Sequence, residues 1–93
     1  MLTLVDYYAD WCGPCQQMKP VMKELEEELA GKIEFSELDV DDPANQAKVQ
    51  GAGVMSIPTF IIEKDGEEVD RKLGAMPKDA MMQWIQQHME NEG

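Results

Sequence analysis

The 93-residue sequence is poor in the residues that build metal centres and disulfide frameworks. It contains only two cysteines, Cys12 and Cys15, and a single histidine, His88. A structural zinc site normally takes four Cys or His ligands, and a disulfide framework takes several Cys pairs. We therefore expect no metal site, and we interpret the Cys-x-x-Cys pair as a chemical group rather than a structural one.

Basic residues and long apolar runs are scarce as well. Eight Lys and Arg stand against nineteen Asp and Glu, which gives a net charge of -11. Such a charge argues against nucleic acid or anionic membrane surfaces as partners. No apolar run approaches the ~18 residues of a membrane span, and the first residues lack the features of a signal peptide. We expect a cytoplasmic protein with no membrane contact.

A hydrophobic fraction of 43% is enough for one domain, which we expect to span residues 1–93. Hydrophobic periodicity and turn residues predict the order β-α-β-α-β-β-α. The expected elements are a buried strand over 2–9, a helix over 12–30, a strand over 33–41, a short helix from Pro43 to about 51, strands over 59–63 and 67–73, and a last helix from Pro77. The helical repeat over 12–30 predicts a buried face of Met18, Val21, Met22, Leu25 and Leu29.

The segment Trp11-Cys12-Gly13-Pro14-Cys15 lies at the predicted turn from the first strand to the first helix. Unpaired N–H groups and the helix dipole favour a thiolate on Cys12 at the helix start, and the thiolate is the reactive form in disulfide exchange. Cys15, one turn further in, is expected to be shielded. We predict dithiol redox chemistry, with Cys12 exposed as the nucleophile and Cys15 as the resolving thiol. Pro14 costs no hydrogen bond at an early helical position.

Asp6 is a carboxylate in the middle of an apolar strand. Burial of such a group is costly unless it is paired or protonated. We expect burial to raise the pKa of Asp6, which makes it a candidate proton acceptor near neutral pH. The alternative is that Asp6 only completes a local hydrogen bond.

The segment Ala9-Asp10-Trp11-Cys12-Gly13-Pro14-Cys15 resembles the active site of thioredoxins, and the resemblance extends from about Leu4 to Met89. Further matches are Val5-Asp6-Tyr7, Ile57-Pro58-Thr59, Gly66 and Gly74-Ala75. The resemblance implies an α/β thioredoxin fold, with a four-stranded mixed sheet of order 2-1-3-4 flanked by helices. The full-length family pattern has one more strand and one more helix before Leu2. We therefore expect the acidic strand over 33–41 to be an open edge.

The resemblance also implies roles for individual residues. Asp6 matches the buried acid-base group beneath the cysteines, and Pro58 matches a cis proline beside them. Asp41 matches a residue that orients Trp11. The partner of Asp6 stays open between Lys19 and Glu37. The implied active-site support is Trp11, Gly13, Pro14, Pro58, Lys19 and Asp41, and the implied substrate groove is Trp11, Met55, Ile57, Gly74 and Ala75.

The activity implied by the resemblance is reduction of protein disulfides by the Cys12/Cys15 dithiol, with no bound cofactor. Disulfide-containing proteins would be its targets, and a thioredoxin reductase or similar donor would recharge it. Gly13-Pro14 resembles the reductants of the family, since isomerases and oxidases usually carry a His beside the second Cys. The alternatives are a glutaredoxin-like or isomerase-like protein, and a non-catalytic binding module with the same fold. The net charge favours a monomer.

Overall fold

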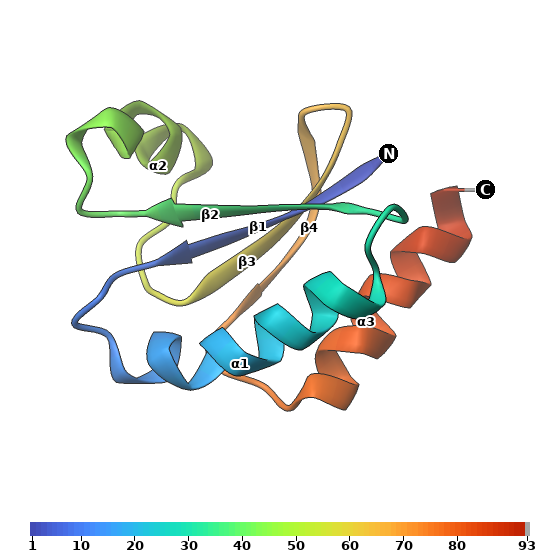
Figure 1. Cartoon of the computed structure of the whole chain (residues 1–93). Coiled ribbons are helices and arrows are strands. Elements are labelled where there is room, and N and C mark those ends of the chain that lie inside the picture. Colours follow the sequence, from blue (N-terminus) through green and yellow to red (C-terminus); the bar gives the residue numbers. More distant parts are fainter. Residues whose placement is uncertain (93) are drawn as a thin grey trace.

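The computed structural model describes residues 1–92, in which a four-stranded mixed sheet carries helices on both faces (Figure 1). The strands are β1 (Leu2–Tyr8), β2 (Glu34–Asp39), β3 (Thr59–Lys64) and β4 (Glu67–Leu73). The helices are α1 (Gly13–Glu28), α2 (Gln46–Ala52) and α3 (Lys78–Glu92), and a 3₁₀ turn (Pro43–Asn45) leads into α2. The spatial order of the strands is β2-β1-β3-β4, which confirms the expected order 2-1-3-4.

β1 lies inside the sheet, parallel to β2 and antiparallel to β3. This register places Asp6 between Glu37 of β2 and Phe60 of β3. β3 and β4 form the expected hairpin, whose turn residues Asp65 and Gly66 both have positive φ angles. The acidic strand β2 is an edge strand, as expected for residues 33–41.

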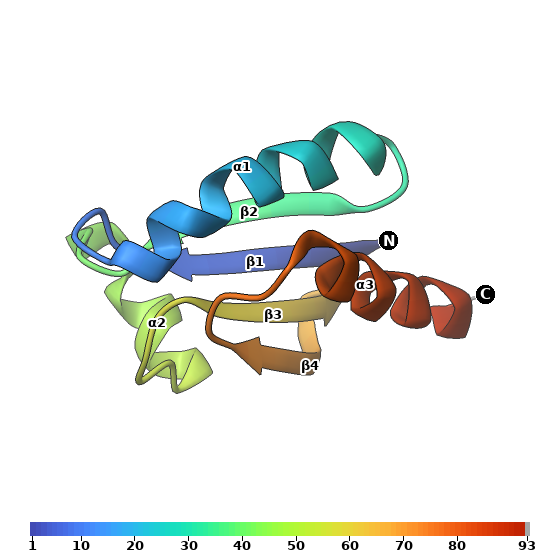
Figure 2. The same cartoon turned by 90° about the horizontal axis from the view of Figure 1, so that it is seen from below.

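Alternation along β1 divides the core between the two faces of the sheet. Leu2 and Leu4 face a core beneath α1 and α3, whereas Val5 and Tyr7 face a smaller core beside α2. Figures 1 and 2 show α1 and α3 side by side on one face and α2 on the other. The predicted buried face of α1 is confirmed, since the core beneath α1 and α3 contains Met18, Met22, Leu25, Leu29 and, partly buried, Val21.

Several elements are shorter than the sequence pattern predicted. β2 ends at Asp39 rather than at residue 41, because Asp39 caps the turn that follows: its side chain accepts the Asp41 N–H and its carbonyl accepts the Asp42 N–H. The helix expected from Pro43 begins as a 3₁₀ turn, and α2 ends before Gly53, which adopts a left-handed conformation. These turns place Asp41 close to the end of β1.

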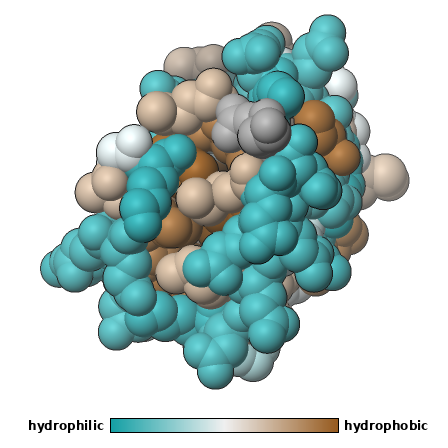
Figure 3. Space-filling model, turned by 90° about the vertical axis from the view of Figure 1, so that its right-hand side faces the viewer, coloured by the Kyte–Doolittle hydropathy of each residue, from teal (hydrophilic) through white to brown (hydrophobic). Residues whose placement is uncertain are grey.

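The carboxyl end of β1 lies at one end of the molecule, and the first residue and the end of α3 lie at the other (Figure 1). Viewed from the end at which β1 begins, the surface is mostly hydrophilic, and apolar side chains are visible mainly in a hollow between hydrophilic ones (Figure 3). In residues 1–92, no helix has the length and apolar character needed to cross a membrane.

Candidate active site

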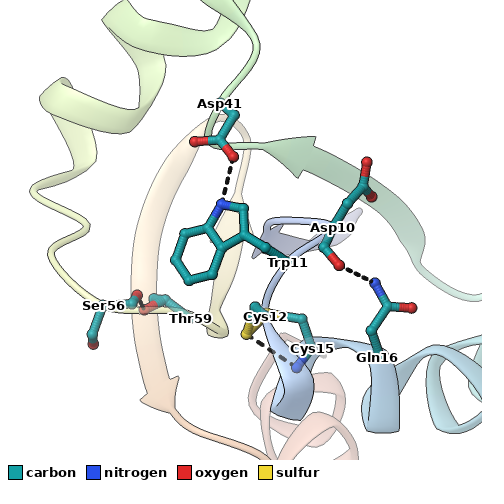
Figure 4. Close-up of a disulfide and its surroundings, with 8 residues drawn as sticks. All are labelled: Asp10, Trp11, Cys12, Cys15, Gln16, Asp41, Ser56 and Thr59. Carbon is teal, nitrogen blue, oxygen red and sulfur yellow. Dashed lines mark hydrogen bonds between the residues drawn. A yellow bond between two sulfur atoms is a disulfide. The ribbon is translucent and has the colours of Figure 1, made fainter.

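The two cysteines form a disulfide where β1 is followed by α1 (Figure 4). Cys12 is the N-cap of α1 and Cys15 lies in its first turn, with Cα atoms 5.2 Å apart. The Cys15 N–H donates a hydrogen bond to Cys12 Sγ at 3.2 Å. Pro14 is in the first turn, where its missing N–H leaves no intrahelical bond unmade. A sulfur that accepts a helix N–H is stabilised as a thiolate once the disulfide is reduced.

The prediction that Cys12 is exposed is wrong for this disulfide state. Cys12 and Cys15 are each 4% exposed and cluster with Ala9, while Tyr8, Val40 and Ile57 pack against them. The fold buries Cys12 because the strand-to-helix turn brings it down onto neighbouring apolar side chains. The two sulfurs therefore differ in their position on the helix, not in their exposure.

Trp11 stands beside the disulfide and is 73% exposed. Its indole Nε1–H donates to Asp41 Oδ2 at 2.7 Å, so Asp41 does hold Trp11, as the resemblance implied (Figure 4). A second bond, missed by the sequence interpretation, runs from Gln16 Nε2 to the Asp10 carbonyl at 2.9 Å. These two bonds fix the loop before α1 from both sides.

Asp6 is 8% exposed, and its Oδ1 atom has no hydrogen-bond partner. Burial, joined by the negative charges of Glu37 and Glu26, raises the pKa of Asp6 from 3.8 to about 7, and Lys19 lowers it by a smaller amount. Both candidate neighbours therefore act on Asp6: Glu37 raises its pKa and Lys19 lowers it. Glu26, on α1, was missed because nothing in the helical pattern shows which strand residue it overlies.

The peptide bond between Ile57 and Pro58 is cis, and Pro58 is buried. The Pro58 carbonyl accepts the Gly74 N–H at 2.8 Å, which places the Gly74 loop next to Pro58. Thr59, also buried, donates its hydroxyl to the Ser56 carbonyl at 2.6 Å. Two segments far apart in sequence are thereby joined near the disulfide.

A hollow of about 170 Å³ lies between Trp11 and the start of this proline segment. It is lined by Trp11, Val40, Val49, Val54, Met55, Ser56 and Ile57. Three of the five expected groove residues are there, and Met55 is 97% exposed. Gly74 and Ala75 are not among the lining residues, so the groove as predicted is only partly assembled in this hollow. The three valines were missed because Val40 follows β2, Val49 is on α2 and Val54 follows α2, and only the fold brings them beside Trp11.

Residues 1–92 contain no cluster of three or more His, Cys, Asp and Glu side chains arranged to hold a metal ion. The reactive groups that the structure places at the site are the sulfur pair and the buried carboxyl group of Asp6.

The thioredoxin family model matches residues 1–87. The chain belongs to the thioredoxin family. Among its relatives, thioredoxin of Bacillus subtilis is 41% identical over 88 residues, which cover 95% of this chain and 83% of the relative. Thioredoxin of Staphylococcus saprophyticus is 45% identical over 89 residues, with the same coverage. A solved structure of a mutant thioredoxin from Halobacterium salinarum superposes with a TM-score of 0.84 at 38% identity, covering 95% of this chain and 74% of that one.

Membership of the thioredoxin family and the Cys12–Cys15 pair identify the activity. The chain is a thiol-disulfide oxidoreductase that acts on protein disulfides. The fold expected from the resemblance is likewise confirmed, since the sheet order matches and a thioredoxin structure superposes on nearly the whole chain.

Proposed function

We propose that this thioredoxin-family protein is a protein-disulfide reductase in which Cys12 attacks, Cys15 resolves and Asp6 accepts a proton. The observation that carries the proposal is the position of the sulfurs on α1: Cys12 Sγ caps the helix and accepts the Cys15 N–H. Only the capping sulfur lies where the helix dipole and free N–H groups favour a negative charge.

The exchange then takes two steps. The Cys12 thiolate attacks one sulfur of the target disulfide, forms a Cys12–target mixed disulfide and expels the other target sulfur as a thiolate. The Cys15 thiolate next attacks Cys12 Sγ, closes the Cys12–Cys15 disulfide and expels the remaining target thiolate. Two electrons pass from the dithiol to the target, and the two target thiolates take up protons.

Cys15 must lose its proton before the second step, and Asp6 is the proposed acceptor. It lies on β1 beneath the helix that carries Cys15, as its interactions with Glu26 and Lys19 of α1 indicate. A pKa of about 7 suits this task, because a group whose pKa is near the working pH can both accept and return a proton. Its unpartnered Oδ1 atom leaves one acceptor unused in the folded chain.

Partners follow from the same chemistry. We propose disulfide-containing proteins as targets and a thioredoxin reductase or similar dithiol donor as the source of electrons. The exposed Trp11 and Met55 beside the disulfide offer apolar surface to a target. No bound cofactor enters the cycle, since the sulfur pair carries both electrons. We further propose that residues 1–93 act as one domain and that the protein works in the cytoplasm, where donors keep such pairs reduced.

The proposal is tested with Cys12→Ser and Cys15→Ser variants. After incubation with insulin or another disulfide protein, Cys15→Ser should accumulate a mixed disulfide visible by non-reducing gel and mass spectrometry, and Cys12→Ser should not. The intact protein should reduce insulin with NADPH and a purified thioredoxin reductase. Trapping by Cys12→Ser alone would reverse the two roles, and intact insulin in every assay would favour the non-catalytic binding module.

A further inference from the structure

Tyr8 is an aromatic residue at the site to which no role has yet been given. It is the last residue of β1, two positions after Asp6, so strand alternation places the two side chains on the same face of the sheet. Tyr8 is half-buried and packs against the cluster that contains the disulfide. The ammonium group of Lys19, on α1, lies 5.8 Å from the centroid of the Tyr8 ring. This separation is within the range of a cation–π interaction.

Lys19 matters because of the charges around Asp6. The charges that act on Asp6 come from Glu37 on β2 and from Glu26 and Lys19 on α1, and Lys19 is the one cation among these three. The lysine is exposed and has a flexible four-carbon stem. An exposed ammonium that moves freely in water is screened from a buried carboxylate, whereas one that is held against the protein surface is screened less.

The ring of Tyr8 is suited to hold such a group. Burial, with the negative charges of Asp39 and Glu37, raises the pKa of the Tyr8 phenol, so the ring stays neutral through the range in which Asp6 titrates. We propose that Tyr8 is a positioning residue whose ring holds the Lys19 ammonium over the face of the sheet that carries Asp6. The proposal rests on the role of Asp6 put forward above.

The consequence concerns the pH at which the resolving step works. With Lys19 held, its positive charge offsets part of the field of Glu37 and Glu26. With Lys19 released to solvent, the two glutamates dominate, the ionised form of Asp6 becomes less favourable and a higher pH is needed to form it. Tyr8 thus sets the lowest pH at which the resolving step proceeds. It supplies no group that takes part in the reaction itself.

The experiment compares Tyr8→Phe, Tyr8→Leu, Lys19→Met and the Tyr8→Leu/Lys19→Met double variant with the intact protein. The pKa of Asp6 is followed by NMR of its ¹³C-labelled carboxyl group, and the pH midpoint of insulin reduction is measured beside it. We expect Tyr8→Leu and Lys19→Met each to raise the carboxyl midpoint by several tenths of a pH unit. Tyr8→Phe keeps the ring and should leave it unchanged. The double variant should shift no further than Lys19→Met alone.

An unchanged midpoint in Tyr8→Leu, or additive shifts in the double variant, would overturn the proposal. If Tyr8→Leu does not fold, the Lys19 side-chain methylene protons next to the ammonium give the same answer in the intact protein. Contact with the ring should move their NMR signals upfield of those of the exposed Lys23, and equal positions would again overturn it. A carboxyl midpoint that moves while the activity midpoint stays would support the positioning of Lys19 and contradict the role of Asp6.

Discussion

At the scale of the residue, the buried carboxyl group of Asp6 lowers the stability of the folded protein at neutral pH. Its pKa is about 7 in the folded chain and 3.8 as an unperturbed group. The unfolded chain therefore releases this proton at a lower pH than the folded chain does. Between pH 4 and pH 7 the folded state holds the extra proton, so the contribution of Asp6 to the free energy of unfolding falls as pH rises.

We predict that Asp6→Asn stabilises the oxidised protein at pH 8 but has little effect at pH 3. The variant should be more stable because the neutral amide removes the cost of a buried charge. The pKa shift of Asp6 sets an upper limit of about 4 kcal/mol on the gain in free energy of unfolding, at 1.36 kcal/mol per pKa unit. The same variant should slow the release of mixed disulfide, since the proposed proton acceptor of Cys15 is lost. Urea unfolding at several pH values and insulin reduction from pH 6 to 9 measure the two effects. Glu27→Gln, an exposed change on α1, is the control.

Two outcomes would contradict these expectations. Equal stability of Asp6→Asn and the intact protein at pH 8 would mean that the carboxylate is not held in an unfavourable environment. Insulin reduction at the unaltered rate across the whole pH range would remove Asp6 from the proton transfer.

Tyr7 gives a second residue-scale prediction. Its side chain is fully buried on the opposite face of β1, and its hydroxyl has no hydrogen-bond partner. A buried, unpaired hydroxyl costs free energy that a phenylalanine of the same shape does not. We expect Tyr7→Phe to raise the free energy of unfolding by about 1 kcal/mol and to leave insulin reduction unchanged, as measured by urea unfolding and turnover. A destabilised variant would show that the hydroxyl is hydrogen-bonded after all.

The residues also show how far sequence reasoning reaches. The apolar neighbours of Asp6 are enough to predict its burial and the direction of its pKa shift. Glu37 and Lys19 were already the two candidate neighbours of Asp6, but that both act on it at once, and that Glu26 joins them, depends on strand register and on how α1 crosses the sheet. Burial of Cys12 was missed for the same reason: a strand-to-helix turn says where a residue is in the chain, not what packs over it.

At the scale of the element, periodicity predicted the strands and helices, but not the bonds that join them. The clearest case is the contact between β4 and α3. Asp70 of β4 accepts hydrogen bonds from Trp84 Nε1 at 2.8 Å and from the His88 ring at 2.9 Å. His88 is the single histidine of the sequence, and its neighbour in the fold is this carboxylate. Trp84 is in the core, and its indole N–H needs the partner that Asp70 supplies.

We predict that Asp70→Ala loosens α3 from the sheet. Trp84 is 5% exposed, so its N–H would be left buried without an acceptor, at a cost of about 1–3 kcal/mol. The hydrogen bonds from Trp84 and His88 lower the pKa of Asp70 below 3.8. Their stabilising effect is therefore complete above that pH and is lost as pH falls through the lowered pKa.

Urea unfolding of Asp70→Ala at pH 7 and pH 2.5 measures this contribution. The difference from the intact protein should be present at pH 7 and reduced at pH 2.5. Glu90→Ala, an exposed change on α3, is the control. A loss of stability that is the same at both pH values would mean that the carboxylate charge is not what holds Trp84 and His88.

At the scale of the whole molecule, charge and edge geometry act against each other. β2 lies at the edge of the sheet, and an edge strand presents unpaired N–H and C=O groups that can pair with another chain. Exposed Glu34 and Glu37, with the partly exposed Asp39, lie along this strand. The net charge of -11 makes every copy repel every other copy. Repulsion between the acidic edges should therefore keep the protein monomeric at low salt.

Salt should shift that balance. The Debye length falls from about 10 Å at 0.1 M to about 3 Å at 1 M, which removes most of the repulsion but leaves the unpaired edge in place. We predict a monomer at 0.1 M salt and edge-to-edge dimers at 1 M, measured by sedimentation equilibrium. A Glu34→Gln/Glu37→Gln variant should dimerise at lower salt than the intact protein, because two charges are removed from β2 itself. The control Glu24→Gln/Glu27→Gln, on exposed positions of α1, changes the net charge equally. If both double variants respond to salt alike, net charge rather than the acidic side chains of β2 governs association. A dimer that is already stable at 0.1 M would mean that these side chains do not protect β2 at all.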